Sequence, residues 1–190
     1  MKVEFNAEKH EYKVGGIVVP SVTQMLESAG FIDTRFFNDS SATRGTYVHQ
    51  SCEWLDNGEL DEESIDPKLK GYIEGYKSFL EDTGAKVIAN ELRVYNKDLN
   101  YAGTLDKIIE MNGKRYLVDL KTGVPSDWHK LQLLAYNIAE KEEFKTESFS
   151  MIALYVNKEG GYKIKKMEGS KKDLKAIESA SNLYHWKNLL

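Results

Sequence analysis

The sequence has one cysteine, three prolines and no long apolar run. A single thiol, Cys52, cannot form an internal disulfide framework, and it cannot supply the four cysteines that hold an iron–sulfur cluster. No apolar stretch approaches the roughly 18 residues of a membrane-spanning helix, and the first residues lack the charged and then apolar layout of a signal peptide. We therefore expect a cytoplasmic protein that has no iron–sulfur cluster and no contact with a membrane.

The sequence also lacks the excess of positive charge that is common in proteins that bind nucleic acids. It has 26 Lys and Arg against 30 Asp and Glu, which gives a net charge of −4 at pH 7. A locally basic groove can still bind a polyanion, and the acids of a metal site lower the net charge until a cation binds. With 190 residues, 41% of them hydrophobic and 29% charged, the chain fits one folded domain with a full core.

The clearest local pattern lies between Gly103 and Gly123. Two runs rich in Ile, Leu, Val and Tyr flank Asn112-Gly113, and Asn-Gly between such runs is the strongest short-range signal for a two-residue type I′ hairpin. In that register the opposed pairs are Met111 with Lys114, Glu110 with Arg115, Ile108 with Leu117, and Asp106 with Asp119. The last pair sets two carboxylates about 5 Å apart, which is destabilising.

The two faces of this hairpin differ in character. Lys121 points to the same face as Asp119, because side chains alternate along a strand. The other face is apolar except for Lys107, and it carries Leu105, Ile109, Tyr116, Val118 and Leu120. We expect that face to be buried. The opposed acids beside an ammonium have three interpretations, namely a divalent-metal site, a carboxylate pair for acid–base or glycosidic chemistry, and a solvated ion cluster.

Three short motifs follow one another here. They are Gly-x-x-Asp from Gly103 to Asp106, Asp-x-Lys-Thr-Gly from Asp119 to Gly123, and Gln-x-x-x-Tyr from Gln132 to Tyr136. In this order and spacing they resemble the motifs of the PD-(D/E)XK nuclease superfamily, and more nearly those of its RecB-like and phage-exonuclease branch. The resemblance covers residues 44–136. It extends less closely to the N-terminal segment, where His10-x-Tyr12 precedes Pro20-Ser21-Val22-Thr23.

The resemblance implies a site for Mg²⁺ or Mn²⁺. Its ligands would be His49, Asp106, Asp119 and the carbonyl of Leu120, and an imidazole ligand suits Mn²⁺ better than Mg²⁺. His49 enters this set because an Arg-Gly pair followed four residues later by His on a helix is a motif of the family.

Further roles follow from the same resemblance. It implies that Asp106, Asp119, Lys121 and Glu91 are catalytic. Arg44, Gln132 and Tyr136 would contact the DNA backbone, although Gln132 and Tyr136 could instead orient Lys121. Arg44 would also lie at the start of a helix, where backbone donors favour anions, and the alternative for it is a solvated salt bridge.

The periodicity of the chain predicts an α/β order of elements. The expected elements are an antiparallel meander in 3–19, a short helix from Ser21 to Leu26, a loop in 31–43, helices in 44–56 and 67–83, a strand in 86–95, the hairpin, a helix from Ser126 or Asp127 to Glu140, strands in 149–156 and 162–167, and a helix in 171–189. The resemblance implies a restriction-endonuclease-like core, a central mixed sheet flanked by helices, with the small N-terminal β meander beside it. We divide the single domain 1–190 into a meander with a short helix (1–30), the nuclease core (44–170) and a C-terminal helix (171–190).

The function that the resemblance implies is metal-dependent hydrolysis of DNA phosphodiester bonds. A phage- or prophage-type exonuclease of recombination is the most specific form of this hypothesis. A DNA repair or restriction-type endonuclease and a catalytically inactive nucleic-acid-binding protein are the alternatives, and the intact acids and Lys121 argue against the inactive form. The expected partners are DNA, further copies of the chain in a ring that sums positive potential on one duplex, and a single-strand annealing or recombination protein.

Overall fold

The N-terminal residues form the small antiparallel sheet that the sequence predicts. The structure, a computed structural model, describes residues 2–33, 39–144 and 149–188. The strands of this sheet, in both chain and sheet order, are β1 (Val3–Asn6), β2 (Glu11–Val14) and β3 (Ile17–Val19). Ser21 then caps helix α1 (Val22–Ser28), because its side chain accepts from the Gln24 amide while the Gln24 side chain accepts from the Ser21 amide.

A five-stranded mixed sheet forms the centre of the fold, as the resemblance implies. Its strands, in sheet order, are β4 (Lys86–Asn96), β5 (Tyr101–Met111), β6 (Lys114–Lys121), β7 (Ser150–Val156) and β8 (Tyr162–Met167). Neighbouring strands are antiparallel except β6 and β7, which are parallel. A parallel pair needs a crossover connection, and helix α4 (Trp128–Phe144) provides it.

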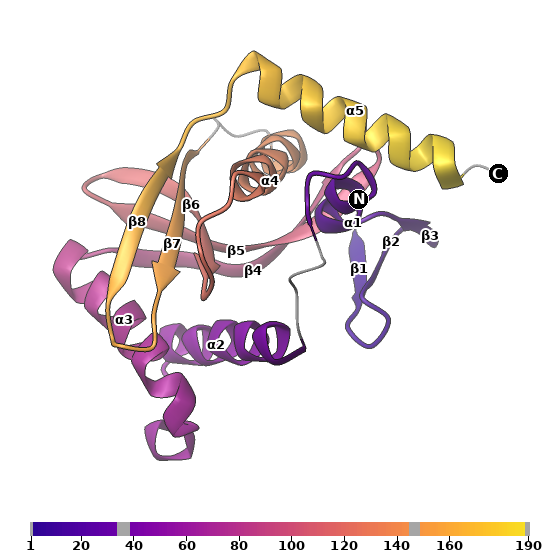
Figure 1. Cartoon of the computed structure of the whole chain (residues 1–190). Coiled ribbons are helices and arrows are strands. Elements are labelled where there is room, and N and C mark those ends of the chain that lie inside the picture. The colour runs from indigo at the N-terminus through magenta and orange to yellow at the C-terminus, as the bar shows by residue number, and fades with distance from the viewer. Residues whose placement is uncertain (1, 34–38, 145–148, 189–190) are drawn as a thin grey trace.

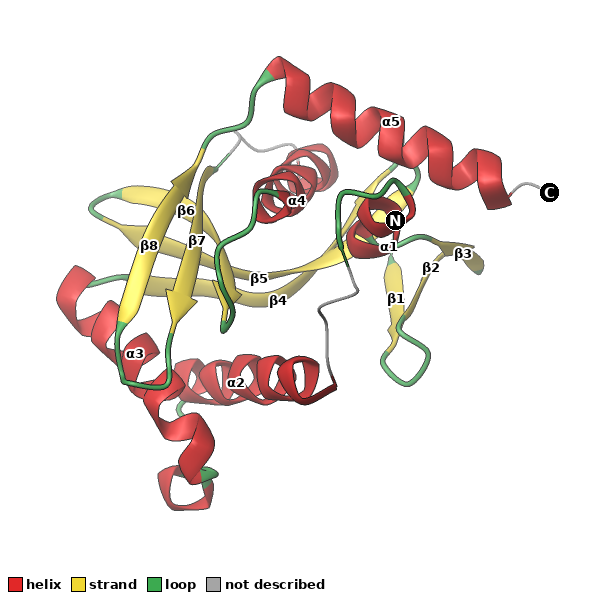
Figure 2. Ribbon diagram, in the orientation of Figure 1, coloured by secondary structure: helices red, strands yellow, loops and turns green. Residues whose placement is uncertain are grey.

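Helices cover both faces of this sheet (Figures 1 and 2). Helices α2 (Asp39–Asn57) and α3 (Pro67–Thr83), with the short 3₁₀ helix η2 (Glu62–Ser64) between them, pack on one face, and α1, α4 and α5 (Lys171–Asn188) pack on the other. The expected α/β fold class is therefore confirmed. Among the residues that the structure describes, no helix is both long and apolar enough to cross a membrane.

The hairpin between β5 and β6 has the predicted turn and register. Asn112 (φ 53°) and Gly113 (φ 69°) both adopt the left-handed conformation that a type I′ turn requires. Three of the predicted pairs, Met111 with Lys114, Glu110 with Arg115 and Ile108 with Leu117, occur in the ladder. The ladder ends at Lys107 and Val118, so the predicted fourth pair does not form part of it. The Asp106 carboxylate instead accepts a hydrogen bond of 2.7 Å from the amide of Leu120.

The expectation that one face of this hairpin is buried proves incomplete. Ile108 and Leu117, on the face that carries the acids, are buried against the core of α1, α4 and α5. Ile109, Val118 and Leu120, on the other face, are buried against α2 and α3. Both faces are covered because the parallel β6–β7 connection places a helix over the sheet, as it does in α/β proteins generally.

Lys107, the exception on the apolar face, is neutralised by a residue of α2. Its ammonium lies 2.6 Å from Oδ2 of Asp56 and donates to Oδ1 of Asn90 at 2.7 Å. Tyr76 of α3 donates to Asp56 at 2.8 Å, and its ring lies 5.0 Å from the ammonium. Both charged side chains are almost fully buried, at 4% and 2% exposure. Asp56 and Lys107 therefore form a buried ion pair that joins α2 to β5.

The predicted start of α2 is wrong. The sequence predicts a loop through residue 43, but α2 already begins at Asp39, and residues 34–38 of that loop lie outside the described residues. Ser is favourable at the start of a helix, because its side chain accepts from the free amides there, and Ser40 and Ser41 follow directly on the first residue of α2. Arg44 therefore lies in the second turn, and the inference that it stands among the free amides of a helix start does not hold.

We predict that Asp56→Ala lowers the free energy of unfolding by about 3–5 kcal/mol, because it leaves the Lys107 ammonium buried without a counter-charge. Urea denaturation measures this change. Glu74→Ala is the matched control, since Glu74 pairs with Lys77 at the surface with 59% of its side chain exposed, and its loss should cost less than about 1 kcal/mol. Equal losses of unfolding free energy in the two variants would show that the buried ion pair stabilises the protein no more than the surface pair does.

Candidate active site

Most of the predicted site residues line one pocket of about 580 Å³. The N-terminal sheet, α1, α2, β4, β5, β6 and α4 all contribute to its wall. The predicted residues in this wall are His49, Glu91, Asp106, Asp119, Lys121, Gln132 and Tyr136. Two predicted residues, Arg44 and Leu120, do not belong to the lining. The fold thus brings together residues that are up to 87 positions apart in the chain, from His49 to Tyr136.

His49, Glu91 and Asp106 form a cluster that could hold a metal ion. One potential ligand atom from each of the three lies within 4.8 Å of the others, and Nδ1 of His49 lies 3.6 Å from Oδ1 of Asp106. Carboxylate oxygens with one imidazole suit a hard divalent cation, with Mn²⁺ accepting the nitrogen more readily. The cluster differs from the ligand set that the resemblance implies, because Glu91 belongs to it and Asp119 does not.

The backbone of Leu120 connects two members of this cluster. Its amide donates to Asp106 at 2.7 Å, and its carbonyl oxygen lies 2.8 Å from Nε2 of His49. A carbonyl oxygen can only accept a hydrogen bond, so in this second contact the proton of the His49 ring is on Nε2. The Nδ1 atom then carries a lone pair on the side of Asp106. The Leu120 carbonyl stays a predicted ligand, because a carbonyl oxygen that accepts one hydrogen bond keeps a second lone pair.

The backbone of β4 departs from regular geometry at Glu91. The register of β4 against β5 shifts between Val87 and Ala89, and Glu91 itself has a φ of 48°. A residue other than glycine in this conformation within a strand is uncommon, and such departures concentrate at functional sites. The residue with this uncommon φ, Glu91, is also the one whose carboxylate belongs to the possible metal cluster.

The pKa of Glu91 is raised to about 7, by burial and then by the charges of Asp106 and Glu53. The residue as a whole is exposed toward the pocket, so water screens part of this effect. A proton on Glu91 near neutral pH relieves the repulsion among these acids. A bound cation would relieve the same repulsion.

Lys121 is held in place by two side chains. Its ammonium donates to Oδ1 of Asp119 and to Oε1 of Gln132, each at 2.9 Å, and it lies 5.4 Å from the centre of the Trp128 ring. Because the ammonium is fixed from several sides, it can present its remaining donor capacity to the pocket in a constant direction.

Asp119 is 2% exposed, and burial raises its pKa to about 7, with Lys121 opposing and Asp106 adding to the shift. Its Oδ2 lies 2.8 Å from the Lys121 ammonium, yet it receives no hydrogen bond of good geometry from the described residues. A buried oxygen with an unused lone pair is expensive unless a further partner is bound. Oδ2 of Asp119 therefore fits a role toward a cation or a water in the pocket.

Gln132 and Tyr136 on α4 are buried, with 7% and 6% exposure. The Gln132 amide nitrogen donates to the Tyr136 hydroxyl at 3.2 Å, and its oxygen accepts from Lys121. Both polar ends of Gln132 thus have partners within the protein. Of the two roles that the resemblance implies for Gln132, these contacts favour the orientation of Lys121.

Gly103 on β5 explains how α4 comes so close to the sheet. A Cβ atom at Gly103 would lie 2.4 Å from Cε1 of Tyr136, which is far inside contact distance. The tyrosine ring therefore occupies the space that any larger residue would fill. Gly103 begins the first sequence motif, and Tyr136 ends the third, which begins 29 positions after Gly103 at Gln132. The two motifs therefore pack against each other.

Arg44 lies apart from the pocket wall. Its guanidinium carbon is 5.6 Å from the centre of the Tyr72 ring on α3, and its Nε is buried without a hydrogen bond to the described residues. This position on the α2–α3 contact does not by itself support the predicted contact with DNA.

Sequence reasoning missed the wall that the N-terminal sheet contributes to the pocket. Phe5, Ala7, His10 and Tyr12 all line it. In the sequence, the pattern His10-x-Tyr12 is the one signal for this wall. The N-terminal residues lie far in sequence from the three motifs, so their contact with the pocket cannot be inferred from local patterns.

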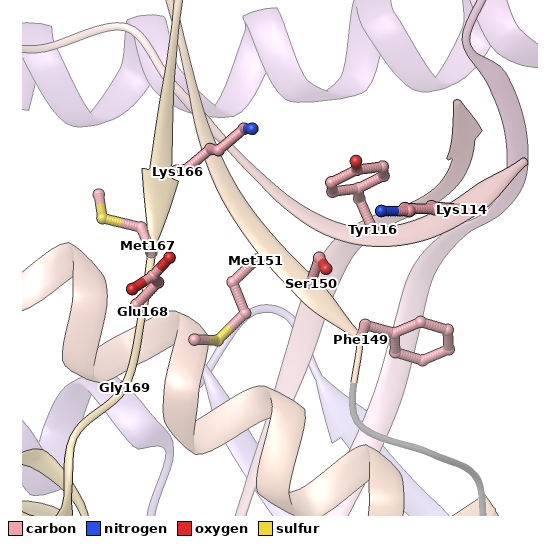
Figure 3. A pocket seen from close by; sticks show the side chains of 9 residues that line it. All are labelled: Lys114, Tyr116, Phe149, Ser150, Met151, Lys166, Met167, Glu168 and Gly169. Carbon is pink, nitrogen blue, oxygen red and sulfur yellow. The ribbon is translucent and has the colours of Figure 1, made fainter. Parts of the chain in front are cut away.

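A second pocket, of about 540 Å³, lies around the first residues of β6 and β7 and the end of β8 (Figure 3). Its lining consists of Lys114, Tyr116, Phe149, Ser150, Met151, Lys166, Met167, Glu168 and Gly169. None of these is a predicted site residue, and Glu168 is the one acid among them. This second pocket therefore lacks the converging carboxylates of the first.

The chain is similar to solved structures of two other proteins. A candidate exonuclease from Eubacterium rectale aligns over 87% of this chain and 73% of its own, with a TM-score of 0.51 and 14% identity. The alkaline exonuclease LHK-Exo of Laribacter hongkongensis aligns over 88% of this chain and 86% of its own, with a TM-score of 0.42 and 11% identity. No model of a known protein family matches the sequence, and no curated protein does. At such low identity the first likeness is a likeness of fold.

We predict that Gly103→Ala lowers the free energy of unfolding by about 1–3 kcal/mol, because the new methyl group must displace the Tyr136 ring. Thermal or urea unfolding measures the change. Gly123→Ala is the control, since a Cβ there meets nothing within 4 Å. If Tyr136 is the obstacle, Gly103→Ala should cost much less in a Tyr136→Ala background. An unchanged cost in that background would locate the strain elsewhere.

We also predict that affinity for Mn²⁺ rises with pH up to about 7 and levels off above it. The pKa values of Glu91 and Asp119 are both raised to about 7, so below that pH protons compete with the cation for the carboxylates. Each competing proton changes the affinity by about tenfold per pH unit. Calorimetric titrations between pH 5.5 and 8.5 measure the slope.

Glu91→Gln provides the control for this dependence on pH. It should bind Mn²⁺ more weakly and with a shallower slope, because one competing proton is gone. A flat affinity from pH 5.5 to 8.5 in the wild-type protein would contradict the involvement of either acid.

Proposed function

We propose that this chain, which has the fold of the PD-(D/E)XK nuclease superfamily, is a metal-dependent nuclease that hydrolyses phosphodiester bonds in DNA. The observation that carries the proposal is the convergence of His49, Glu91 and Asp106 beside a fixed lysine in one pocket. Acids for a cation and an ammonium for a phosphate, side by side, are the groups that phosphodiester hydrolysis requires.

His49, Asp106 and Glu91 would hold Mg²⁺ or Mn²⁺, with Asp119 and the Leu120 carbonyl as further ligands. The ion would supply a Lewis acid for the scissile phosphate and a bound water of lowered pKa. The protein's own residues set the geometry around it. The Leu120 backbone orients both Asp106 and His49, and Oδ2 of Asp119 receives no hydrogen bond from the described residues, which leaves a lone pair for a ligand.

Lys121 would act on the water or the phosphate. Its ammonium is anchored by Asp119 and Gln132, so it needs little reorganisation when negative charge develops on the phosphate oxygens. A preorganised donor of this kind is worth on the order of 100-fold or more in rate. Gln132 would act as a positioning residue that keeps Lys121 aimed at the reacting group.

DNA as the substrate and exonucleolytic cleavage extend the proposal beyond the geometry of the site. The fold likeness to a candidate exonuclease supports exonucleolytic cleavage. A phage-type exonuclease of recombination is the most specific form, and with it go a homo-oligomeric ring and a single-strand annealing or recombination partner. A ring would reconcile a chain of net charge −4 with a polyanionic substrate, because several subunits would sum their local positive potential on one duplex.

The role of Lys121 can be separated from that of the metal ligands. We expect Lys121→Met to retain its fold and its affinity for Mn²⁺ but to lose hydrolysis by about 100-fold or more, since the lysine acts on the reacting groups. Asp106→Asn should lose both. Calorimetry with Mn²⁺ and cleavage of a labelled linear duplex measure the two properties, and Lys114→Met, an exposed lysine at the far end of β6, is the control. If Lys121→Met cleaves DNA within a few-fold of the wild-type rate, the assigned role is wrong.

A further inference from the structure

A cluster of aromatic rings in the N-terminal sheet forms part of the wall of the active-site pocket. Phe5 of β1, His10 of the following turn and Tyr12 of β2 all line it. The Phe5 and Tyr12 rings are 4.6 Å apart and tilted by 31°, and the His10 ring stands edge-on to Phe5 at 5.4 Å. These rings are close enough to form a single aromatic surface.

This aromatic wall is fixed relative to the metal cluster. The Tyr12 hydroxyl shares a hydrogen bond of 2.8 Å with Oγ1 of Thr104 on β5, two residues before Asp106. Thr104 pairs in the sheet with Arg93 of β4, which is two residues after Glu91. The Ala102 amide also donates to the Pro20 carbonyl at 2.9 Å, which ties the end of the N-terminal sheet to β5. The wall and the cluster are therefore connected through strands β4 and β5.

Parts of this wall stay open to a ligand. Tyr12 is buried and supports the others from behind, whereas His10 is exposed and Phe5 is half-buried. The guanidinium of the exposed Arg93, outside the pocket lining, lies 5.9 Å from the centre of the Phe5 ring. His10 has a φ of 49°, the left-handed conformation that residues other than glycine rarely adopt. His10 thus presents an exposed ring beside the pocket.

We propose that Phe5, His10 and Arg93 form a subsite that stacks a nucleobase of the strand being cleaved, and this proposal rests on the proposed nuclease function. Nucleobases present flat faces that stack on aromatic side chains regardless of sequence, and an arginine beside them can pair with a phosphate. The base must be unpaired to reach the rings, so the strand enters the pocket as a single strand. The subsite would thereby set the distance between one unpaired base and the bond that is cut.

The test pairs changes in the protein with changes in the DNA. All proteins carry Lys121→Met to suppress cleavage, and they bind a fluorescent single-stranded decanucleotide with Mn²⁺ present. An abasic nucleotide is moved through the oligonucleotide one position at a time. With the aromatic wall intact, one position should lose affinity by about tenfold or more, because stacking on one base is lost.

Two variants remove the rings without endangering the fold. His10→Gly removes the imidazole and suits the left-handed backbone, and Phe5→Leu keeps apolar volume in the small core while it removes the ring. Each should bind the intact oligonucleotide more weakly, by about tenfold, and should no longer respond to the abasic nucleotide. Ile17→Ala is the control, because Ile17 is 69% exposed in the same sheet and does not line the pocket. It should bind as the parent does.

The possible results distinguish the two proposals. A parent protein that binds the oligonucleotide with no sensitive abasic position, or with the same sensitivity in His10→Gly and Phe5→Leu, overturns the stacking subsite and leaves the nuclease function standing. A protein that neither binds DNA with Lys121→Met nor cleaves it with Lys121 intact overturns both. Loss of the abasic response in the two ring variants alone supports the subsite.

Discussion

Repulsion among Glu91, Asp106 and Asp119, which share one pocket, is the constraint on which the other contacts of the site depend. Asp106 raises the pKa of both other acids. The protein offsets this repulsion in part, because Lys121 pairs with Asp119 and the Leu120 amide donates to Asp106. The pKa values of Glu91 and Asp119 nevertheless stay raised to about 7, first because of burial and then because of the charge of Asp106. A divalent cation would supply the missing positive charge, and the proposed function follows from that need.

Helix α2 and strand β5 are the two elements that give the metal cluster its shape. His49 near the middle of α2 reaches Asp106, and Asp56 near its end reaches Lys107, the next residue of β5. On the other side, the gap at Gly103 lets Tyr136 and Gln132 of α4 approach the same strand. The Asp56–Lys107 ion pair and the contact of Gly103 with Tyr136 lie outside the metal cluster. They hold α2 and α4 against β5, and so they position the side chains that would bind the metal ion or orient Lys121.

Much of this arrangement could be predicted from the sequence, because its signals are local. Asn112-Gly113 specifies the turn and register of the hairpin, and Pro67 and Gly84 mark the ends of α3. The remainder depends on contacts between distant residues. The sequence does not show that Lys107 finds Asp56, that Glu91 leaves regular strand geometry to join the cluster, or that the N-terminal sheet forms a wall of the pocket. The early start of α2 was missed because Asp and Ser suit a loop as well as a helix start.

One measurement tests the proposed hydrolysis most directly. An end-labelled linear DNA duplex and a closed circular duplex of the same sequence are each incubated with the protein, with Mn²⁺ or with a chelator. We expect the linear duplex to be degraded from its ends with Mn²⁺ only, the closed circle to survive, and Asp106→Asn to leave both intact. Degradation that persists in the chelator, or that Asp106→Asn performs as fast as the wild-type protein, would contradict a metal-dependent nuclease built on this cluster.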